Sequence, residues 1–159
     1  MKSRAAVMGV SIMLAAAAAA EAPTVKFPTG YREWVQLKSM VIVSDKHPLF
    51  GPFAGIHHVY VNKVGLPAAK GHGAYPDGSV LVFELLQANE ANGAYTEGSR
   101  KLVAVMQKDA RRFKATGGWG FEGFKNGGSD RLVTDPATQC FNCHQTQKDH
   151  DYVFSRFRE

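Results

Sequence analysis

The sequence predicts an α+β protein built on an antiparallel sheet, and three observations support this class. Several short segments alternate apolar and polar residues with a period of two, as half-buried strands do. The 16 glycines, together with turn signals such as Pro76-Asp77-Gly78, separate these segments. A helix-start pattern, Asp135-Pro136, occurs near the C-terminus. This combination argues against a four-helix bundle.

Four segments are predicted to be strands, and they cover residues 33–44, 55–62, 77–87 and 117–124. In the first, alternation places four apolar residues on one face, namely Val35, Leu37, Val41 and Val43. The third is apolar on both faces except at Glu84. A run of this kind predicts a central, buried strand.

The segment from residue 99 to residue 115 fits two patterns. Residues 101–107 alternate as a strand does, whereas Leu102, Val105, Met106 and Phe113 fit helical spacing. We expect a strand to about Lys108, followed by a short helix over 109–115.

A further helix is expected around the cysteines, over 135–147. Asp135 would be its N-cap, and Pro136 would occupy the first helical position.

The first 20 residues have the pattern of a cleaved signal peptide. Lys2 and Arg4 form a short positive region, an alanine-rich apolar run follows, and Ala18-Ala19-Ala20 fits a signal peptidase site. The apolar run is shorter than the roughly 20 residues of a membrane-spanning helix. We therefore predict a signal peptide over 1–20 and a single domain over 21–159. The domain is expected to be exported to the periplasm in soluble form, with no membrane segment left after cleavage.

Size and charge limit the classes of partner. Removing the signal leaves 139 residues, enough for one domain with one core. It also lowers the formal net charge from +5 to +3, because Lys2 and Arg4 leave with it. The remaining basic residues are scattered among acids, without a basic stripe interleaved with aromatics, so nucleic acid is not a predicted partner.

The only two cysteines stand in the segment Cys140-Phe141-Asn142-Cys143-His144. A disulfide or redox pair needs no histidine after it, and redox motifs occur near the start of a βαβ unit. A zinc site needs two further ligands, and none stands at a familiar spacing. The pattern is typical of covalent attachment of one haem c. Cys140 and Cys143 would then be thioethers, and His144 the proximal iron ligand.

The other axial side of such an iron has no obvious protein ligand. No methionine follows His144, and His150 is too close along the chain to reach the opposite side. The upstream candidates are Met40, Met106, His57, His58 and His72. Each is more simply explained as a core or surface residue, so the sequence favours an iron with an open position, suited to ligand binding or chemistry.

Several segments of the mature chain, in order, carry a family resemblance: FPTGYREWVQLKSMVI, HHVYVN, YPDGSVLVFELL, VMQKDARRF, GGWGFEGF, and CFNCH with DYVFSRF. With these the chain resembles the cytochrome P-460 family. The resemblance implies a five-stranded antiparallel sheet with flanking helices, a c-type haem attached near the C-terminus, and a homodimer. One branch of the family oxidises hydroxylamine with a haem cross-linked to a lysine. The other, cytochromes c′-beta, lacks the cross-link and binds nitric oxide or carbon monoxide beneath a phenylalanine-rich cap.

Three positions of the resemblance imply the c′-beta branch. The position of the cross-linking lysine, in the strand after the Asp-Gly turn, is Phe83 in this chain. Lys70 precedes that turn and does not match. The distal acid of oxidising members corresponds to Ala104, and their distal arginine corresponds to His57.

The resemblance further implies that Phe83 and Phe53 cap the haem. Two rings without a hydrogen-bond donor favour small neutral diatomic ligands over anionic or strongly hydrated ones. We therefore expect a protein that binds nitric oxide or carbon monoxide, and scavenges or stores nitric oxide, rather than an oxidoreductase. The alternatives are hydroxylamine oxidation and six-coordinate electron transfer. The sequence identifies neither a redox partner nor a role for His57.

Overall fold

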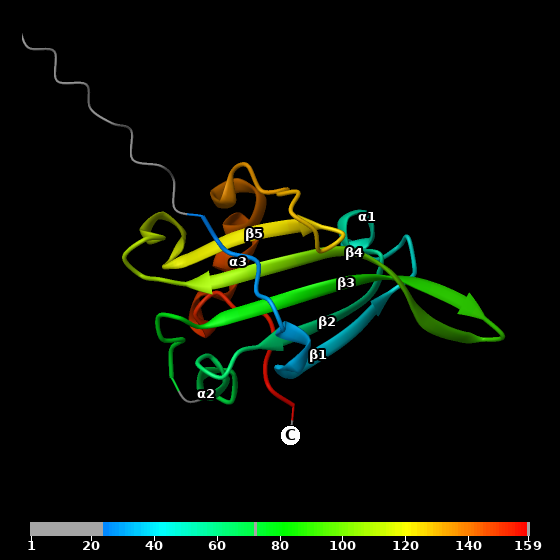
Figure 1. Cartoon of the computed structure of the whole chain (residues 1–159), viewed down its shortest axis with the longest axis horizontal. Coiled ribbons are helices and arrows are strands. Elements are labelled where there is room, and N and C mark those ends of the chain that lie inside the picture. The colour runs from blue at the N-terminus through cyan, green and yellow to red at the C-terminus, as the bar shows by residue number, and fades with distance from the viewer. Residues whose placement is uncertain (1–23, 72, 159) are drawn as a thin grey trace, which may run out of the picture.

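The computed structural model describes residues 24–71 and 73–158, which form an open five-stranded antiparallel sheet with short helical segments (Figure 1). Neighbours in the sheet are neighbours in the chain, in the order β1-β2-β3-β4-β5. The predicted α+β class and the five-stranded antiparallel sheet are confirmed. The predicted signal peptide, residues 1–20, lies outside the described residues.

The strands are β1 (Val35–Ile42), β2 (Gly55–Val61), β3 (Val80–Ala91), β4 (Ala94–Lys108) and β5 (Trp119–Lys125). The helical segments are η1 (Tyr31–Glu33), α1 (Phe50–Phe53), α2 (Leu66–Ala69), η2 (Lys114–Thr116), η3 (Ala137–Phe141), α3 (Asn142–His144) and η4 (Gln145–His150). No helix in 24–71 or 73–158 has the length and apolar character needed to cross a bilayer.

The prediction of a central, buried third strand is confirmed. β3 lies between β2 and β4, and its one charged inner residue, Glu84, is 1% exposed. β3 carries apolar residues on both of its faces because both faces are covered by packed side chains.

The single apolar face predicted for residues 33–44 is wrong. The register between β1 and β2 shifts between Gln36 and Lys38, which is a bulge at Leu37. Leu37 is fully buried, whereas Val35, Val41 and Val43 are among the exposed large hydrophobic residues. A bulge adds one residue to one strand, so side chains beyond it change face.

The helix predicted over 109–115 is also wrong. β4 ends at Lys108 as expected, but residues 109–113 form turns, and only the short 3₁₀ turn η2 follows. The Asp109 carboxylate accepts the backbone N–H groups of Arg111 and Arg112, and the Asp77 carboxylate accepts that of Ala110. These bonds satisfy the backbone locally and replace the helical ones.

The helix predicted around the cysteines is confirmed: η3, α3 and η4 follow one another directly, with a kink at Gln147 inside η4. The carboxylate of Asp135 accepts the backbone N–H groups of Ala137 and Thr138, at 3.0 and 3.4 Å. This is the capping role expected of Asp135.

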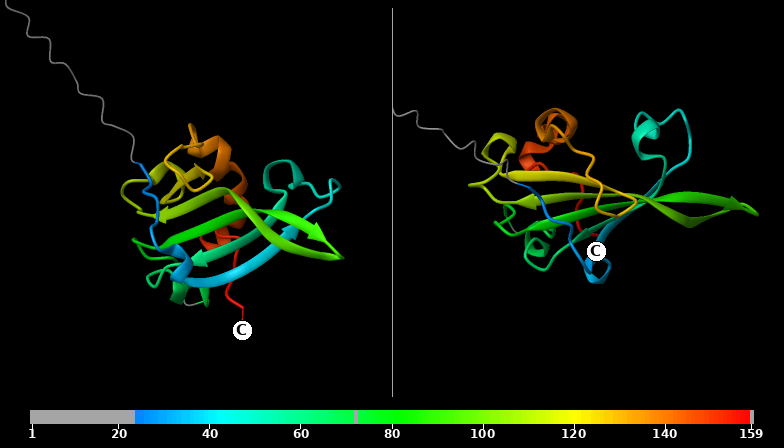
Figure 2. Two further views of the ribbon diagram at one scale, coloured as in Figure 1. Left: turned by 45° about the vertical axis from the view of Figure 1, so that its right-hand side comes forward. Right: turned by 45° about the horizontal axis from the view of Figure 1, so that its top comes forward.

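Each face of the sheet carries its own core. On one face, Leu81, Met106 and Phe121 form a cluster that also holds Cys140 and Phe141. On the other, residues of the N-terminal segment pack on the sheet with Val82, Val103 and Phe124. Figure 2 shows α1 and the C-terminal helical run on one side of the sheet and η1 on the other. We call the first the cysteine face and the second the Glu84 face.

Candidate haem-binding site

The ring of His144 is fixed in orientation by a backbone carbonyl. Its Nδ1 lies 2.8 Å from the carbonyl oxygen of Tyr152, and the bond requires Nδ1 to carry the proton. Burial lowers the pKa of His144, and the bond to Tyr152 opposes the shift. The ring is therefore neutral near pH 7, with the Nε2 lone pair available. This is the state in which a histidine binds a metal, with its other nitrogen held by a carbonyl.

The loop that supplies this carbonyl is tied to the sheet. Asp151 forms an ion pair with Lys108 at 2.6 Å, and its carbonyl accepts the indole N–H of Trp119 at 2.8 Å. Asp151 and Tyr152 both have positive φ, at 52° and 67°. Residues other than glycine keep such a conformation only where surrounding contacts hold it. The orientation of His144 therefore depends on residues of β4 and β5.

Both cysteines are free thiols, and they differ in exposure. Cys140 is half-buried against the cysteine-face cluster, and Cys143 is exposed. Burial raises the pKa of the Cys140 thiol to about 11, with Glu122 and Asp135 adding to the shift. Redox-active cysteines have a lowered pKa, so this environment does not favour a redox pair. No cluster of three or more His, Cys, Asp or Glu side chains suited to a metal ion occurs in 24–71 or 73–158, so the zinc interpretation gains no ligands there.

Phe83 and Phe53, predicted as a pair, are brought together by the fold. Their ring centroids are 5.3 Å apart in an edge contact, although the residues are 30 positions apart in the chain. Phe53 ends α1, and Phe83 lies on the cysteine face of β3. The contact forms because α1 is the connection between β1 and β2 and returns the chain to the sheet beside β3.

On β4 and β5, the positions level with Phe83 carry small residues. Phe83 pairs with Ala104 on β4, and Ala104 pairs with Gly123 on β5. Two residues along β5 is Phe121, whose ring centroid is 5.0 Å from that of His144. Ala104 and Gly123 therefore lie between the ring of Phe83 and the ring of Phe121, which contacts His144.

His57 joins Phe83 on the cysteine face. It is 3% exposed, and its ring centroid lies 4.6 Å from that of Phe83. Burial lowers the pKa of His57 to about 4, and the positive charge of Lys38 adds to the shift. The pair of phenylalanines thus has a neutral imidazole beside it, which the expected all-apolar cap did not include.

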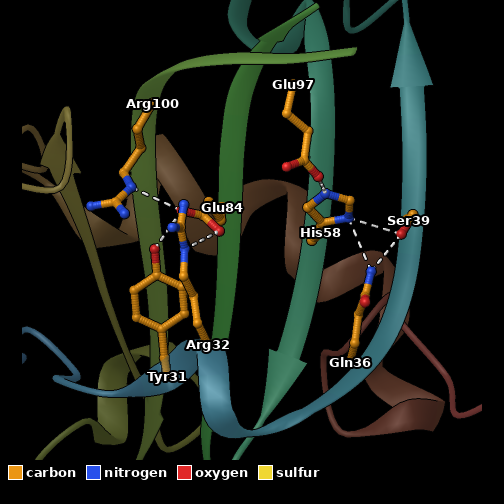
Figure 3. Close-up of polar contacts among 8 residues, drawn as sticks. All are labelled: Tyr31, Arg32, Gln36, Ser39, His58, Glu84, Glu97 and Arg100. Atoms are coloured by element: carbon orange, nitrogen blue, oxygen red, sulfur yellow. Dashed lines mark hydrogen bonds and ion pairs between the residues drawn. The ribbon is translucent and has the colours of Figure 1, made fainter. Parts of the chain in front are cut away.

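The other residues considered as axial ligands lie in different places. Met40 pairs with His57 across β1 and β2, and Met106 is buried in the cysteine-face cluster. His58 is not on this face: its ring is bonded to Glu97 on the Glu84 face (Figure 3). His72 lies outside the described residues. Lys70 ends α2, with its ammonium 4.7 Å from the Phe157 ring centroid, and is not on the strand of Phe83.

The residues present fit a haem. The donor set is one neutral, oriented histidine and two thiols within one helical run, which is the set a c-type haem requires. Around it, apolar side chains that a protein ordinarily buries are partly or largely exposed. They are Phe53, Phe83, Phe141, Leu132 and Phe154, the last two at 44% and 48% exposure.

Comparison with known proteins identifies the family. Residues 28–155 match the family model described as Cytochrome P460. The chain belongs to the cytochrome P460 family. No curated protein matches it. Membership implies a haem cofactor, and it agrees with the donor set described above.

Two cavities lie beside this set of residues, the first partly lined by Asp151 and Tyr152. One, of about 710 Å³, lies between α2 and the C-terminal segment and is lined by Tyr75, Lys148 and Arg156 among others. The second, of about 340 Å³, lies by α1 and is lined by Phe50, Gln87 and Tyr95 among others. Neither is lined by Phe83, His57 or His144.

Sequence reasoning missed the supports of His144. Tyr152 acts through its carbonyl, so its residue type gives no signal. The ion pair of Lys108 with Asp151 joins positions 43 apart, which no local pattern reveals. Gly117 offered a partial signal: its φ is 65°, and a Cβ there would lie 2.5 Å from the Tyr152 ring.

Proposed function

We propose that this protein is an exported c-type cytochrome of the P460 family that carries one covalent haem c and binds small diatomic gases. One observation carries the gas-binding part. Phe83 stands where the oxidising branch has its cross-linking lysine, and its ring packs edge-on against Phe53.

Each residue of the site has a definite role in this proposal. Cys140 and Cys143 form the thioethers, and Nε2 of His144 is the proximal ligand, with Nδ1 held by Tyr152. The haem, when bound, would supply an iron able to bind a small ligand. The Lys108–Asp151 pair keeps the histidine loop against the sheet and so limits movement of His144.

Phe83 and Phe53 select the ligand. Aromatic rings offer no strong hydrogen bonds, so an anion or a strongly hydrated ligand would lose solvation there without replacement. A neutral diatomic molecule loses little. Neither Phe83 nor Ala104 can accept a proton or join a haem covalently, and the pKa of His57, lowered to about 4 by burial and Lys38, makes it a weak proton acceptor. This disfavours hydroxylamine oxidation, since that chemistry needs a positioned proton acceptor.

The proposed location, assembly and biological role follow from the sequence and from the family. We propose export to the periplasm after removal of residues 1–20, a homodimer as in the family, and scavenging or storage of nitric oxide as the biological role.

Visible spectra of the purified protein in both oxidation states test the proposal against its alternatives. We expect a high-spin haem that takes up carbon monoxide when reduced and does not turn over hydroxylamine with an added electron acceptor. A strongly red-shifted chromophore with steady hydroxylamine oxidation would favour the oxidising branch instead. A low-spin spectrum that carbon monoxide does not change would favour electron transfer.

A further inference from the structure

The larger of the two cavities lies between α2 and the C-terminal segment and has a volume of about 710 Å³. Small-molecule sites are concave and commonly measure about 300–1,000 Å³, so this cavity can hold an organic ligand. Of its lining residues, only Asp151 and Tyr152 support the proposed haem-binding site. The other lining side chains have no role in that site.

The cavity exists because the C-terminal segment is fastened to the rest of the fold at two points. At the first, the Asp151 carboxylate accepts hydrogen bonds from the Lys108 ammonium at 2.6 Å and from the Tyr75 backbone N–H at 3.0 Å. At the second, the backbone N–H of Phe157 donates to the Ala69 carbonyl of α2 at 3.1 Å. Long-range contacts of the folded chain therefore hold the lining residues in place.

Three cationic side chains line this cavity, namely Lys70, Lys148 and Arg156. None of the three forms an ion pair with a carboxylate within residues 24–71 and 73–158. Of the two acids in the lining, Asp151 is already paired, and Asp149 remains. With histidine neutral, the unpaired charged groups of the lining carry a net charge of +2, three positive and one negative. Charges of one sign around a concave surface concentrate a potential there that attracts the opposite sign.

Two of the cations are held at the cavity by other residues of its lining. Lys70 Nζ lies 4.7 Å from the ring centroid of Phe157, and Arg156 Nη2 bonds Nε2 of His150. A guanidinium has five N–H donors, so this bond leaves most of them for a ligand. Lys70, Lys148 and Arg156 are all exposed residues, so a molecule from solvent can reach them.

We propose that this cavity binds a small, multiply charged organic anion that carries carboxylate or phosphate groups. Guanidinium and ammonium groups form charge-assisted hydrogen bonds with both kinds of group. The half-buried rings of Tyr152 and Phe157 provide aromatic surface for the body of the ligand. An anion with a single charge would satisfy only part of the cationic lining and would bind more weakly. This binding site is separate from the proposed gas binding and does not depend on it.

Isothermal titration calorimetry of the haem-loaded protein tests the proposal with three aromatic anions. We expect saturable binding of one anion per chain for benzene-1,2,4-tricarboxylate, for phenyl phosphate or for both, and no measurable binding for benzoate, which has one charge. The first two probes distinguish a carboxylate from a phosphate as the preferred group.

Charge-removing variants locate the bound anion. Lys148→Gln and Arg156→Gln should each weaken binding about twofold to fivefold, the range for one exposed charge pair, and the double variant about tenfold. The control is Lys46→Gln, which removes an exposed charge that does not line the cavity and should leave the affinity unchanged.

No saturable binding of either multiply charged probe would overturn the proposal. An unchanged affinity in the double variant would also overturn it, because the anion would then bind elsewhere. An equal loss of affinity in Lys46→Gln would do the same, since binding would then follow the net charge of the protein. None of these outcomes bears on carbon monoxide uptake, which tests the proposed function separately.

Discussion

The two faces of the sheet treat neighbouring residues in opposite ways. On β3, Glu84 faces one side and Phe83 the other; on β2, His58 and His57 divide likewise. Glu84 Oε1 accepts hydrogen bonds from Tyr31 at 2.6 Å and from two arginines (Figure 3). Phe83 is only partly buried, and His57 keeps an unbonded nitrogen.

On the Glu84 face, the buried carboxylate of Glu84 finds all its partners within the chain itself. Arg32 Nη2 lies 2.6 Å and Arg100 Nε 2.8 Å from Glu84 Oε1. Burial alone would raise the pKa of Glu84, but the hydrogen bonds from Arg32 and Tyr31 outweigh it and lower the pKa below 4.5. A buried carboxylate with this many donors is satisfied. On the cysteine face, Nδ1 of His57 has no such partner, as expected of a surface that is covered only when a haem binds.

The largest effect should follow from removing the attachment of that cofactor. The double variant Cys140→Ser, Cys143→Ser should lose covalent haem entirely, because a hydroxyl does not form the thioether. Intact mass after expression with export measures this directly: the wild type should exceed the mature chain by one haem, and the variant should not. Colour that passes into the organic phase on acid–acetone extraction of the wild type would contradict covalent attachment.

Glu84→Gln should give the next largest effect, on stability alone. It removes the buried charge that Arg32 and Arg100 share. These arginines are 55% and 29% exposed and stay hydrated without their partner, so the cost should be about 2 kcal/mol, below the range for a fully buried pair. The free energy of unfolding from urea denaturation gives the value. Carbon monoxide association should stay at the wild-type rate, since Glu84 faces away from Phe83.

Glu97→Gln is the matched control on the same face. Glu97 is 59% exposed, so its pair with His58 should contribute less than about 1 kcal/mol. An altered ligand rate in Glu84→Gln, with none in Glu97→Gln, would mean that the two faces are coupled through β3.

Local signals in the sequence account for what could be predicted. β3 was identifiable because a central strand is apolar on both faces. The haem motif was identifiable because Cys140, Cys143 and His144 lie within five consecutive residues. The bulge at Leu37 was not identifiable, because it exists only in the register of β1 with β2. The failed helix over 109–115 has the same origin, since Asp77, far along the chain, bonds the backbone of Ala110.

The candidate site divides in the same way. Phe83 and Phe53 could be named from the family resemblance, yet their contact depends on the path of α1 across the sheet. His57 and His58 are adjacent histidines on one strand. A period of two places them on opposite faces, but it does not show which of the two rings has hydrogen-bond partners. Only the structure shows that the His58 ring is bonded, because its partners Ser39 and Glu97 come from β1 and β4.

Phe83→Ala should change both stability and ligand kinetics, in contrast to Glu84→Gln one position along the strand. Losing a partly buried ring should cost about 2 kcal/mol, below the range for a fully buried phenylalanine. Because the ring faces the proposed pocket, carbon monoxide and nitric oxide should associate faster with the variant. Stopped-flow mixing with both ferrous proteins, beside urea denaturation of each, makes the comparison. Equal association rates would remove Phe83 from the site and leave it as a core residue.

The smallest effect concerns the protonation of His57. Unfolded, this histidine takes up a proton near its ordinary pKa of 6.5, whereas burial and Lys38 lower the pKa in the folded protein to about 4. Between these values the unfolded state binds more protons, so stability falls as the pH falls. From about pH 7.5 to about pH 5.5 the contribution of His57 should be a loss of about 1 kcal/mol.

Urea denaturation of the wild type and His57→Leu at both pH values isolates this contribution, because the other titrating groups are common to both proteins. The wild type should lose about 1 kcal/mol more than the variant. Equal losses would mean that the folded protein protonates His57 as readily as the unfolded chain does. His57 would then be hydrated, or bonded to an acceptor that favours its charged form. In either case the contrast between its unbonded ring and the bonded ring of His58 would no longer hold.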